Sequence, residues 1–553
     1  MPTILDKVGG VINEIEGGTY PLWIWAPVAV LGLIVLRWLT RPEPYKGVPE
    51  PPCPSKLWGH FQSAHVTPAG RHWGRYFDVY GPSIKVNAPL GAGKMLVTAD
   101  PATIHHVLTT NCYSYTKSTF TRPFVKRLIG EGLVWSEGDM HKLQRKQLVP
   151  AFSQEAVNLM GPIIRDVVER CSDKVGQLMD QGNGIVDIHD IVSKTTLDVF
   201  GRVALNLDFD CIEDGSPEIR RKWRAQSNTI IKPDGFKHIA VLRAFPWIAN
   251  LPVPVIQAQG DVKAVVEPLA GDIIETARRN ANASSIKGND LLSMLLRTGE
   301  MTGNRLRDNI STFIVAGFDS TSASATWCLY ALARNQRVQN KLREELLAFG
   351  REPTEKDLAS MAAFPYFDAV IKETLRMYPV TDAERVALED DVVPLKFPIT
   401  KPDGSKITEL HIRKGDSMVI PFICSNRLNL VWGDGDNFRP ERWLDEKTMP
   451  PKDQLTQGWS NLVTFSEGPR LCIGVRLGTI TYSCALTHSD KRVFFCSPFG
   501  DESMLPLQLN CTMFANQSLC RSFFSRSFAT TRSVLHRTSL RSTATSSLLS
   551  SLS

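Results

Sequence analysis

The sequence predicts a mainly α-helical protein with a small β-region, one amino-terminal transmembrane helix and a disordered carboxyl-terminal tail. Helical spacing of apolar residues dominates 152–300 and continues through 305–335. Two extended runs, S-I-K-V-N-A and K-M-L-V-T-A, flank a Gly-rich turn within 83–99, which predicts a β-hairpin. An uncharged apolar stretch lies near the amino end, and a Ser- and Arg-rich stretch lies at the other end.

The apolar stretch extends from residue 17 to residue 36 without a charge, and Arg37 and Arg41 follow it. A helix needs about 20 such residues to cross a bilayer. Cations dominate the carboxyl-terminal flank, so the positive-inside rule leaves the rest of the chain in the cytosol. The acidic first residues disfavour a cleaved signal peptide. We expect an amino-terminal segment at 1–16, a transmembrane anchor at 17–40 and a stiff, proline-rich hinge at 41–54.

Composition narrows the class of function. Hydrophobic content of 43% and charged content of 22% are ordinary for a globular protein. Most of the net charge of +6 lies after Gly474, so the body is nearly neutral and shows no nucleic-acid-binding footprint. The 11 cysteines form no C-x-x-C pair and no zinc-like spacing, which favours a reduced, cytosol-facing domain over a disulfide framework.

Two short patterns place polar residues on one face of a helix. His141 and Arg145, in G-D-M-H-K-L-Q-R-K, are four residues apart. They form either a ligand-binding pair or a solvated basic face. Glu373 and Arg376, in E-T-L-R, are three residues apart and can form an ion pair. The second pattern is common in helices, so it has no meaning without its context.

The helix predicted at 305–335 contains the sequence A-G-F-D-S-T. Gly317 in mid-helix costs about 1 kcal/mol relative to alanine, which suggests that its missing side chain leaves room for a ligand. Asp319 and Ser320 add an acid and a hydroxyl, and such a pair can relay protons through water. Thr321 adds a second hydroxyl. The alternative is that the acid and the serine lie on the solvent side of the helix.

Residues 465–474 read F-S-E-G-P-R-L-C-I-G. Cys472 lies between Gly468 and Gly474, and Arg470 precedes it by two residues. Such a cysteine can be a buried thiol, a nucleophile or a metal ligand. Glycine lets backbone approach a flat ligand closely, and a guanidinium suits a carboxylate. A thiolate needs a cation or a metal to stay deprotonated at neutral pH, so we favour a metal ligand.

The pattern F-x-x-G-x-R-x-C-x-G resembles the haem-binding loop of cytochrome P450 monooxygenases, in particular fungal microsomal ones. The other motifs occur in that family's order, and the resemblance covers about residues 20–474. It implies the haem-thiolate fold for a catalytic domain at 55–477, with haem b held by Cys472 as the axial thiolate. The implied propionate-binding residues are His141, Arg145, Arg385 and Arg470. The implied buried triad that braces the cysteine loop is Glu373, Arg376 and Arg442.

The activity implied by the resemblance is insertion of one oxygen atom from O2 into a lipophilic small molecule. Candidate substrates are a secondary metabolite, a terpenoid or steroid, and an aromatic xenobiotic. Asp319 and Ser320 would manage protons with help from Thr321; the family usually has threonine where Ser320 stands. The sequence shows no flavin- or nicotinamide-binding domain, so electrons would come from NADPH–cytochrome P450 reductase, with cytochrome b5 as a further candidate. The anchor implies the endoplasmic reticulum membrane, with the catalytic domain in the cytosol.

The resemblance fades after Gly474. The segment V-R-L-G-T-I-T-Y-S-C-A-L-T-H allows about four helical turns, whereas the family continues with a longer helix and a β-rich end. Residues 521–553 contain no acid and cannot form a core. We therefore expect a non-family tail at 478–553, which a mis-spliced or fused gene model would explain. Two alternatives stay open, a haem-binding pseudoenzyme inactivated by this tail and a haem-thiolate enzyme that uses peroxide or isomerises its substrate.

Overall fold

The computed structural model describes residues 43–489 together with Gly32 and residues 533–534. Within 43–489 the description omits 182–184, 215–217, 232–234, 252–253, 281–289, 299–300, 302 and 352. Almost all of the predicted anchor at 17–40 and most of the predicted tail at 478–553 lie outside the described residues. Among the residues that are described, no helix is long and apolar enough to span a bilayer. The chain divides into two compact units, 1–46 and 47–553, and the second is described below.

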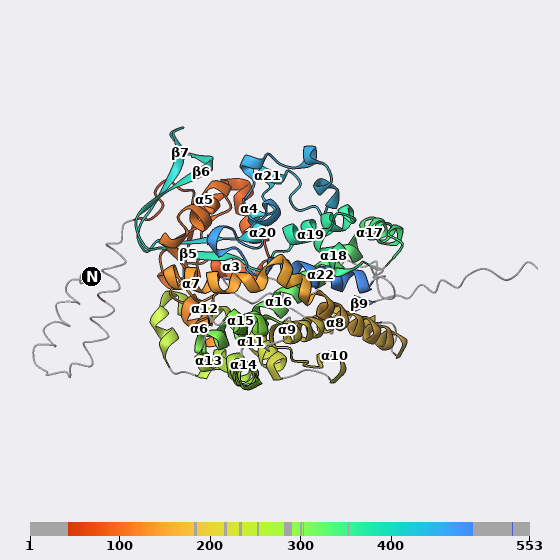
Figure 1. Cartoon of the computed structure of the whole chain (residues 1–553). Coiled ribbons are helices and arrows are strands. Elements are labelled where there is room, and N and C mark those ends of the chain that lie inside the picture. Colours follow the sequence, from red (N-terminus) through yellow and green to blue (C-terminus); the bar gives the residue numbers. More distant parts are fainter. Residues whose placement is uncertain are drawn as a thin grey trace, which may run out of the picture. The chain divides into compact units, whose positions relative to one another are not determined.

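Helix α16 (Asn304–Arg334) is the centre of a helical body (Figure 1). The helices that it contacts include α9 (Ile188–Leu205), α14 (Asp261–Asn280), α19 (Pro365–Met377) and α22 (Val475–Ser489). The contact with α9 is the most extensive. A Cβ atom at Gly317 would lie 2.2 Å from the ring of Phe200 on α9. Gly317 therefore permits the close approach of two helices, and it also lines the cavity described below, in keeping with the space for a ligand that the sequence suggested.

Further helices complete the body. The longer ones are α4 (Arg71–Tyr80), α6 (Thr121–Ile129), α7 (Gly138–Leu148), α8 (Gln154–Gln181), α11 (Glu218–Ile231), α12 (Gly235–Ala244), α15 (Leu291–Thr298) and α17 (Gln336–Ala348). The shorter ones are α3 (Phe61–Val66), α5 (Pro101–His105), α10 (Cys211–Asp214), α13 (Pro254–Gln257), α18 (Glu355–Ser360), α20 (Phe422–Ser425) and α21 (Asn429–Trp432). Short turns used below are the π-turn η2 (His106–Thr110) and the 3-10 turns η5 (Pro246–Asn250), η7 (Pro440–Trp443) and η11 (Gly468–Arg470).

The small β-region is a five-stranded sheet in the order β1-β2-β8-β5-β3. Its strands are β1 (Ser83–Asn87), β2 (Lys94–Thr98), β3 (Tyr115–Thr116), β5 (Ala383–Ala387) and β8 (Ser417–Ile420). Strands β1 and β2 pair antiparallel, with Ser83 opposite Thr98, which confirms the hairpin predicted within 83–99. Strands β6 (Asp391–Thr400) and β7 (Lys406–Ile412) form a separate hairpin, seen at the upper left of Figure 1.

Helix α19 shows how local sequence sets an element that the site needs. Pro365 occupies its first turn, where a missing N–H is harmless. The side chain of Glu345 accepts the N–H groups of Tyr366 and Phe367, both over 2.8 Å, and so satisfies two unpaired donors of the first turn. The helix ends at Met377 because Tyr378 precedes a proline, which disfavours helical backbone.

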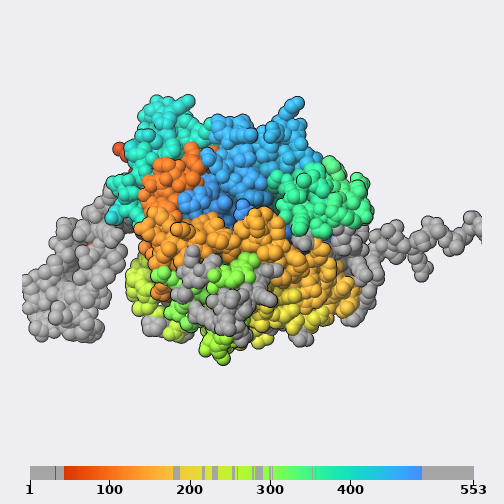
Figure 2. Space-filling model, viewed as in Figure 1, coloured from red at the N-terminus to blue at the C-terminus, as the bar shows by residue number. Residues whose placement is uncertain are grey.

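Helix α22 extends the folded body beyond residue 477. Its side chains Leu477, Ile480, Tyr482 and Cys484 are buried, and it contacts α8 and α16. Beyond it, strand β9 (Ser533–Val534) pairs antiparallel with β4 (Ile185–Val186). In the space-filling view, the orange segment around 100–150 lies against the blue segment around 440–480 (Figure 2), in keeping with the contact between η2 and η11.

Candidate active site

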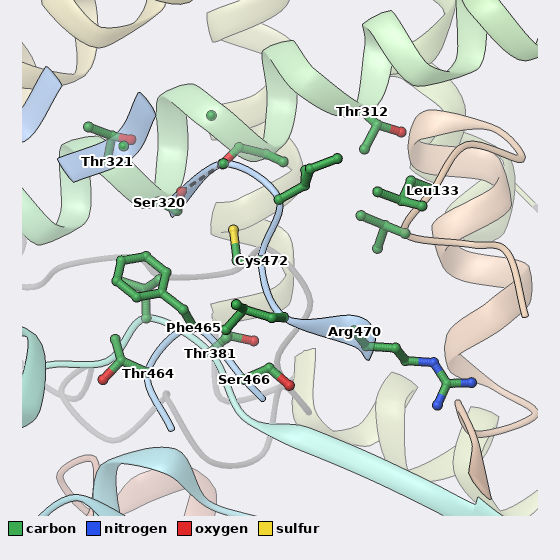
Figure 3. A pocket seen from close by; sticks show the side chains of 18 of the residues that line it. Leu133, Thr312, Ser320, Thr321, Thr381, Thr464, Phe465, Ser466, Arg470 and Cys472 are labelled. Carbon is green, nitrogen blue, oxygen red and sulfur yellow. Dashed lines mark hydrogen bonds between the residues drawn. The ribbon is translucent and has the colours of Figure 1, made fainter. Parts of the chain in front are cut away.

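Cys472 follows the turn η11 and faces a cavity beside α16 (Figure 3). Its N–H donates to the carbonyl of Phe465 over 2.9 Å, which closes the loop. Gly468 has a φ of +67°, and a Cβ there would lie 2.4 Å from the carbonyl oxygen of Leu108 in η2. Only glycine fits this approach. At Gly474 the nearest atom to an added Cβ is the sulfur of Cys472, at 4.0 Å.

The cavity has a volume of about 350 Å³ and separates α16 from the cysteine loop. Cys472 lies deep in the protein, yet its side chain is exposed because the cavity reaches it. Burial raises the pKa of the Cys472 thiol, and a backbone N–H and Arg145 offset this only in part. A bound metal deprotonates such a thiol outright. Apolar side chains line much of the cavity, including Val125, Leu133, Phe152, Phe200, Phe313 and Leu477.

Five basic side chains gather around one part of the cavity, and we call them the cavity cluster: Lys117, His141, Arg145, Arg385 and Arg470. Nη1 of Arg145 donates to the carbonyl of Leu471, beside Cys472, over 2.6 Å. Nη1 of Arg385 donates to the carbonyl of Glu384 over 2.9 Å. Arg470 points away from Cys472 in Figure 3 and forms an ion pair with Glu137.

Glu137 forms ion pairs with two members of the cavity cluster, Lys117 and Arg470. Burial alone would raise the pKa of Glu137, but Lys117 and Arg470 more than offset it and lower that pKa to about 2. Burial lowers the pKa of Lys117 to about 8 and that of Arg385 to about 10. Burial, with the neighbouring cations, lowers the pKa of His141 to about 4, so the ring is neutral at pH 7.

The cavity cluster therefore has unused capacity for anions. Four cations face the carboxylates of Glu137 and Glu384, and Glu384 is already paired with Arg243, so positive charge is in excess. Nε of Arg385 and Nε of Arg470 are buried and have no hydrogen-bond partner within the described part of the chain. An unpaired buried donor is expensive, so a group that supplies carboxylate oxygens fits here. The two propionates of haem are such oxygens.

Helix α16 carries the predicted acid and hydroxyls, all of which line the cavity. Asp319 is 7% exposed and accepts a hydrogen bond from Nε1 of Trp223 over 3.0 Å. The hydroxyl of Ser320 donates to the carbonyl of Ala316 over 2.7 Å. In Figure 3, Ser320 lies on the cavity side of α16, across from Cys472, and Thr321 lies farther from the sulfur.

A second group of charged residues lies beneath the cysteine loop, and we call Glu373, Arg376 and Arg442 the brace cluster. All three side chains are 0% exposed. Nε and Nη2 of Arg376 each donate to the Glu373 carboxylate over 2.9 Å, and Nε of Arg442 donates over 3.1 Å. Nε1 of Trp443 and the N–H of Arg439 also donate to it, over 2.9 and 2.8 Å. Burial alone would raise the pKa of Glu373, but the two arginines lower it overall.

The brace cluster connects to the cysteine loop through Asn426. Nη1 of Arg376 donates to the Asn426 carbonyl over 3.0 Å. The Asn426 side chain accepts the N–H of Val463 over 3.1 Å and donates to the hydroxyl of Thr464 over 2.7 Å. That hydroxyl donates to the carbonyl of Leu375 on α19 over 2.8 Å. The segment that enters the loop is thus fixed to α19.

The structure brings the predicted residues to the cavity or to the brace cluster, except Gly468, which packs against η2, and it adds three that the sequence did not reveal. Lys117 and Glu137 belong to the surroundings of Arg470, and Trp223 contacts Asp319. Glu137 directly precedes the helix that carries His141, a position that favours an acid on electrostatic grounds. Nothing in the sequence around Lys117 or Trp223 signals a functional role.

Comparison with known proteins gives a consistent result. The Cytochrome P450 family model matches residues 49–489, past the boundary near 477 at which we expected the catalytic domain to end. Cytochrome P450 monooxygenase claW of Ampulloclitocybe clavipes is 29% identical over 91% of this chain and 94% of its own length. Cytochrome P450 monooxygenase 128 of Postia placenta is 31% identical over 83% of this chain and 87% of its own length. The chain therefore belongs to the cytochrome P450 family of haem-thiolate monooxygenases.

Proposed function

We propose that this monooxygenase inserts one oxygen atom of O2 into a C–H or C=C bond of a lipophilic small molecule, with Cys472 as the iron ligand. The observation that carries the proposal is the position of Cys472. Its sulfur faces a largely apolar cavity that has α16 on the other side and the cavity cluster beside it. Haem bound there supplies oxygen-activating chemistry, and thiolate ligation favours O–O cleavage.

The residues around the cavity divide the work of holding haem. Gly474 leaves open space beside the sulfur for a flat ligand, Gly468 lets the loop pack against the backbone of η2, and Cys472 binds the metal. The propionate carboxylates are bound by the cavity cluster, where Arg385 and Arg470 have unpaired Nε donors. Lys117 joins the four residues expected from the sequence, because it lines the same part of the cavity.

Residues of α16 deliver protons to the side of the cavity opposite Cys472. Ser320 now donates to a backbone carbonyl, and rotation about χ1 turns its hydroxyl toward the cavity. The carboxylate of Asp319 lies one residue away and can accept and pass on a proton, and Thr321 offers a second hydroxyl. An acid and an alcohol in this order relay protons through water.

The lining of the cavity indicates the class of substrate. A largely apolar cavity suits a lipophilic molecule such as a secondary metabolite, a terpenoid or steroid, or an aromatic xenobiotic.

Electrons come from NADPH–cytochrome P450 reductase, with cytochrome b5 as a further donor. The uncharged stretch at 17–36 and the 62% exposed Trp247 in η5 support attachment to the endoplasmic reticulum membrane, with the catalytic domain in the cytosol.

The absorption spectrum of the reduced, CO-bound protein tests the iron ligand. We expect a thiolate-type Soret band in the wild type and its loss in Cys472→Ala. Cys211→Ala is the control, because Cys211 is a buried cysteine that does not line the cavity. A thiolate-type band that survives in Cys472→Ala contradicts the proposal.

Turnover tests the reaction class. With the reductase and NADPH, we expect a library of lipophilic compounds to yield products that carry one oxygen atom from O2. A thiolate-type spectrum without NADPH-dependent oxidation would instead identify a pseudoenzyme. Turnover with hydrogen peroxide alone, unaffected by replacement of Asp319 and Ser320, would identify a peroxide-using enzyme.

A further inference from the structure

The carboxylate of Asp319 has a hydrogen-bond donor from outside its own helix. Nε1 of Trp223, on α11, donates to Oδ1 of Asp319 over 3.0 Å. Trp223 is 5% exposed and Asp319 is 7% exposed. Because water competes weakly at this depth, the indole N–H fixes the position of the carboxylate.

Helix α11 is itself fixed, so the position of the indole is set by helix packing. Arg220 lies three residues before Trp223, on the same face of α11. Its side chain is 2% exposed, and Nη2 donates to Oδ1 of Asp190 on α9 over 2.6 Å. The ring of Trp223 packs edge-on against Phe318 of α16, with 5.8 Å between centroids. One face of α11 is therefore attached to both α9 and α16.

A simpler explanation is that the bond only satisfies a buried indole. The fold does not require this, because Nε1 of Trp73 is buried and has no hydrogen-bond partner among the residues described. Trp73 is 1% exposed and does not line the cavity. Neither tryptophan lines the cavity, but the N–H of Trp223 meets the acid of the proposed proton relay and that of Trp73 does not.

We infer that Trp223 is a positioning residue for proton delivery, because its N–H holds the Asp319 carboxylate beside Ser320. The inference rests on the proposed function, in which Asp319 manages protons. Reduction of O2 by two electrons and two protons gives hydrogen peroxide, whereas four electrons and four protons give water. Less effective proton delivery shifts the balance from water to peroxide. Trp223 therefore limits the loss of reducing equivalents as peroxide.

The test uses the full chain with bound haem, reconstituted with the reductase and NADPH in the absence of organic substrate. The readout is the amount of hydrogen peroxide formed for each NADPH oxidised. Trp223→Phe keeps an aromatic ring against Phe318 but removes the N–H donor. We expect it to raise the peroxide yield about five-fold, the scale of one typical hydrogen bond. The matched control Trp73→Phe should leave the yield unchanged.

The variant Asp319→Asn distinguishes a failure of the inference about Trp223 from a failure of the proposed role of Asp319. A raised peroxide yield in Asp319→Asn but not in Trp223→Phe overturns the role of Trp223 and leaves the proposed function intact. No change in either variant overturns the role of Asp319 as well. The double variant should match Asp319→Asn alone, and additive effects would contradict the inference.

A variant that keeps an N–H donor guards against a purely structural effect. Trp223→His can still donate to Asp319, so we expect a peroxide yield closer to the wild type than to Trp223→Phe. The thiolate-type CO spectrum should be retained in both. Equal peroxide yields in the His and Phe variants would show that ring volume, not the N–H group, matters and would overturn the inference.

Discussion

The brace cluster and the cavity cluster contain similar residues but differ in how completely their hydrogen bonds are satisfied. In the brace cluster, Glu373 accepts five hydrogen bonds, and Nη1 of Arg376 reaches the carbonyls of Asn426 and Gly435. In the cavity cluster, Arg385 and Arg470 each keep a buried Nε without a partner in the described chain. Buried arginines that are fully paired by the chain contribute to the fold, and those left with free donors have capacity for a ligand.

This difference predicts opposite consequences for two kinds of mutation. A change in the brace cluster should weaken the fold with or without haem. A change in the cavity cluster should weaken haem retention and leave the haem-free fold nearly unaffected.

Glu373→Gln should have the largest effect. It removes the negative charge between two arginines that are 0% exposed, and breaking a buried pair in this way costs about 3–5 kcal/mol. Urea unfolding of the haem-free protein should show the loss. Glu441→Gln is the control, because Glu441 pairs with Arg337 at a site where its side chain is 29% exposed. There we expect a loss of about 1 kcal/mol or less. Equal losses in the two variants would contradict a special role for the brace cluster.

Arg385→Met should act on haem instead of on the fold. Losing one charge-assisted bond to a propionate costs about 2 kcal/mol, or roughly 30-fold faster haem loss. Transfer of haem to apomyoglobin measures this rate. The unfolding free energy of the haem-free protein should stay constant or rise, because burial lowers the pKa of Arg385 to about 10 and its Nε is unpaired. Arg376→Met should show the reverse, with an unstable haem-free fold. Identical behaviour of the two variants would remove the distinction between the clusters.

Sequence reasoning identified residues that lie in motifs and missed those that depend on tertiary contact. The hairpin within 83–99 is confirmed because alternation and turn residues are local signals. Cys472, Asp319 and Glu373 were found because family spacing marks them. Trp223 and Asp319 are 96 residues apart, and Glu137 and Arg470 are 333 apart, so no local pattern reveals either pair. Gly317 lines the cavity as the sequence suggested, but its second role, the contact with Phe200, depends on the neighbouring helix and has no local signal.

Several expectations stay predictions. The anchor at 17–40 and most of the tail at 478–553 lie outside the described residues, so their structure is untested. The roles assigned to the site residues rest on their positions and on family spacing. Helix α22 is described as far as Ser489, and the family model ends at the same residue. Its 15 residues make about four turns, as the sequence allowed, but the domain boundary expected near 477 was too early, because the burial of this helix depends on α8 and α16.

Asp382 extends the comparison to a buried carboxyl group without a charged partner. It is 7% exposed, Oδ1 accepts the N–H of Phe422 over 2.8 Å, and Oδ2 has no partner among the described residues. Burial raises the pKa of Asp382 from 3.8 to about 7. Between these values the folded protein binds a proton that the unfolded chain has released, so stability falls as pH rises from about 4 to about 7. Glu373 has the opposite sign, because its lowered pKa makes its contribution disappear on acidification.

Asp382→Asn should therefore flatten the loss of stability between about pH 4 and pH 7. At pH 8 we expect a gain on the order of 1 kcal/mol, because the uncharged amide removes the buried charge but leaves a polar group short of partners. At pH 4 the variant and the wild type should be alike. Urea unfolding at several pH values measures the slope. Burial also raises the pKa of Glu467 to about 7, so part of the slope should persist until Glu467→Gln is added. An unchanged slope in Asp382→Asn would show that its charge is already compensated, and the contrast with Glu373 would then fail.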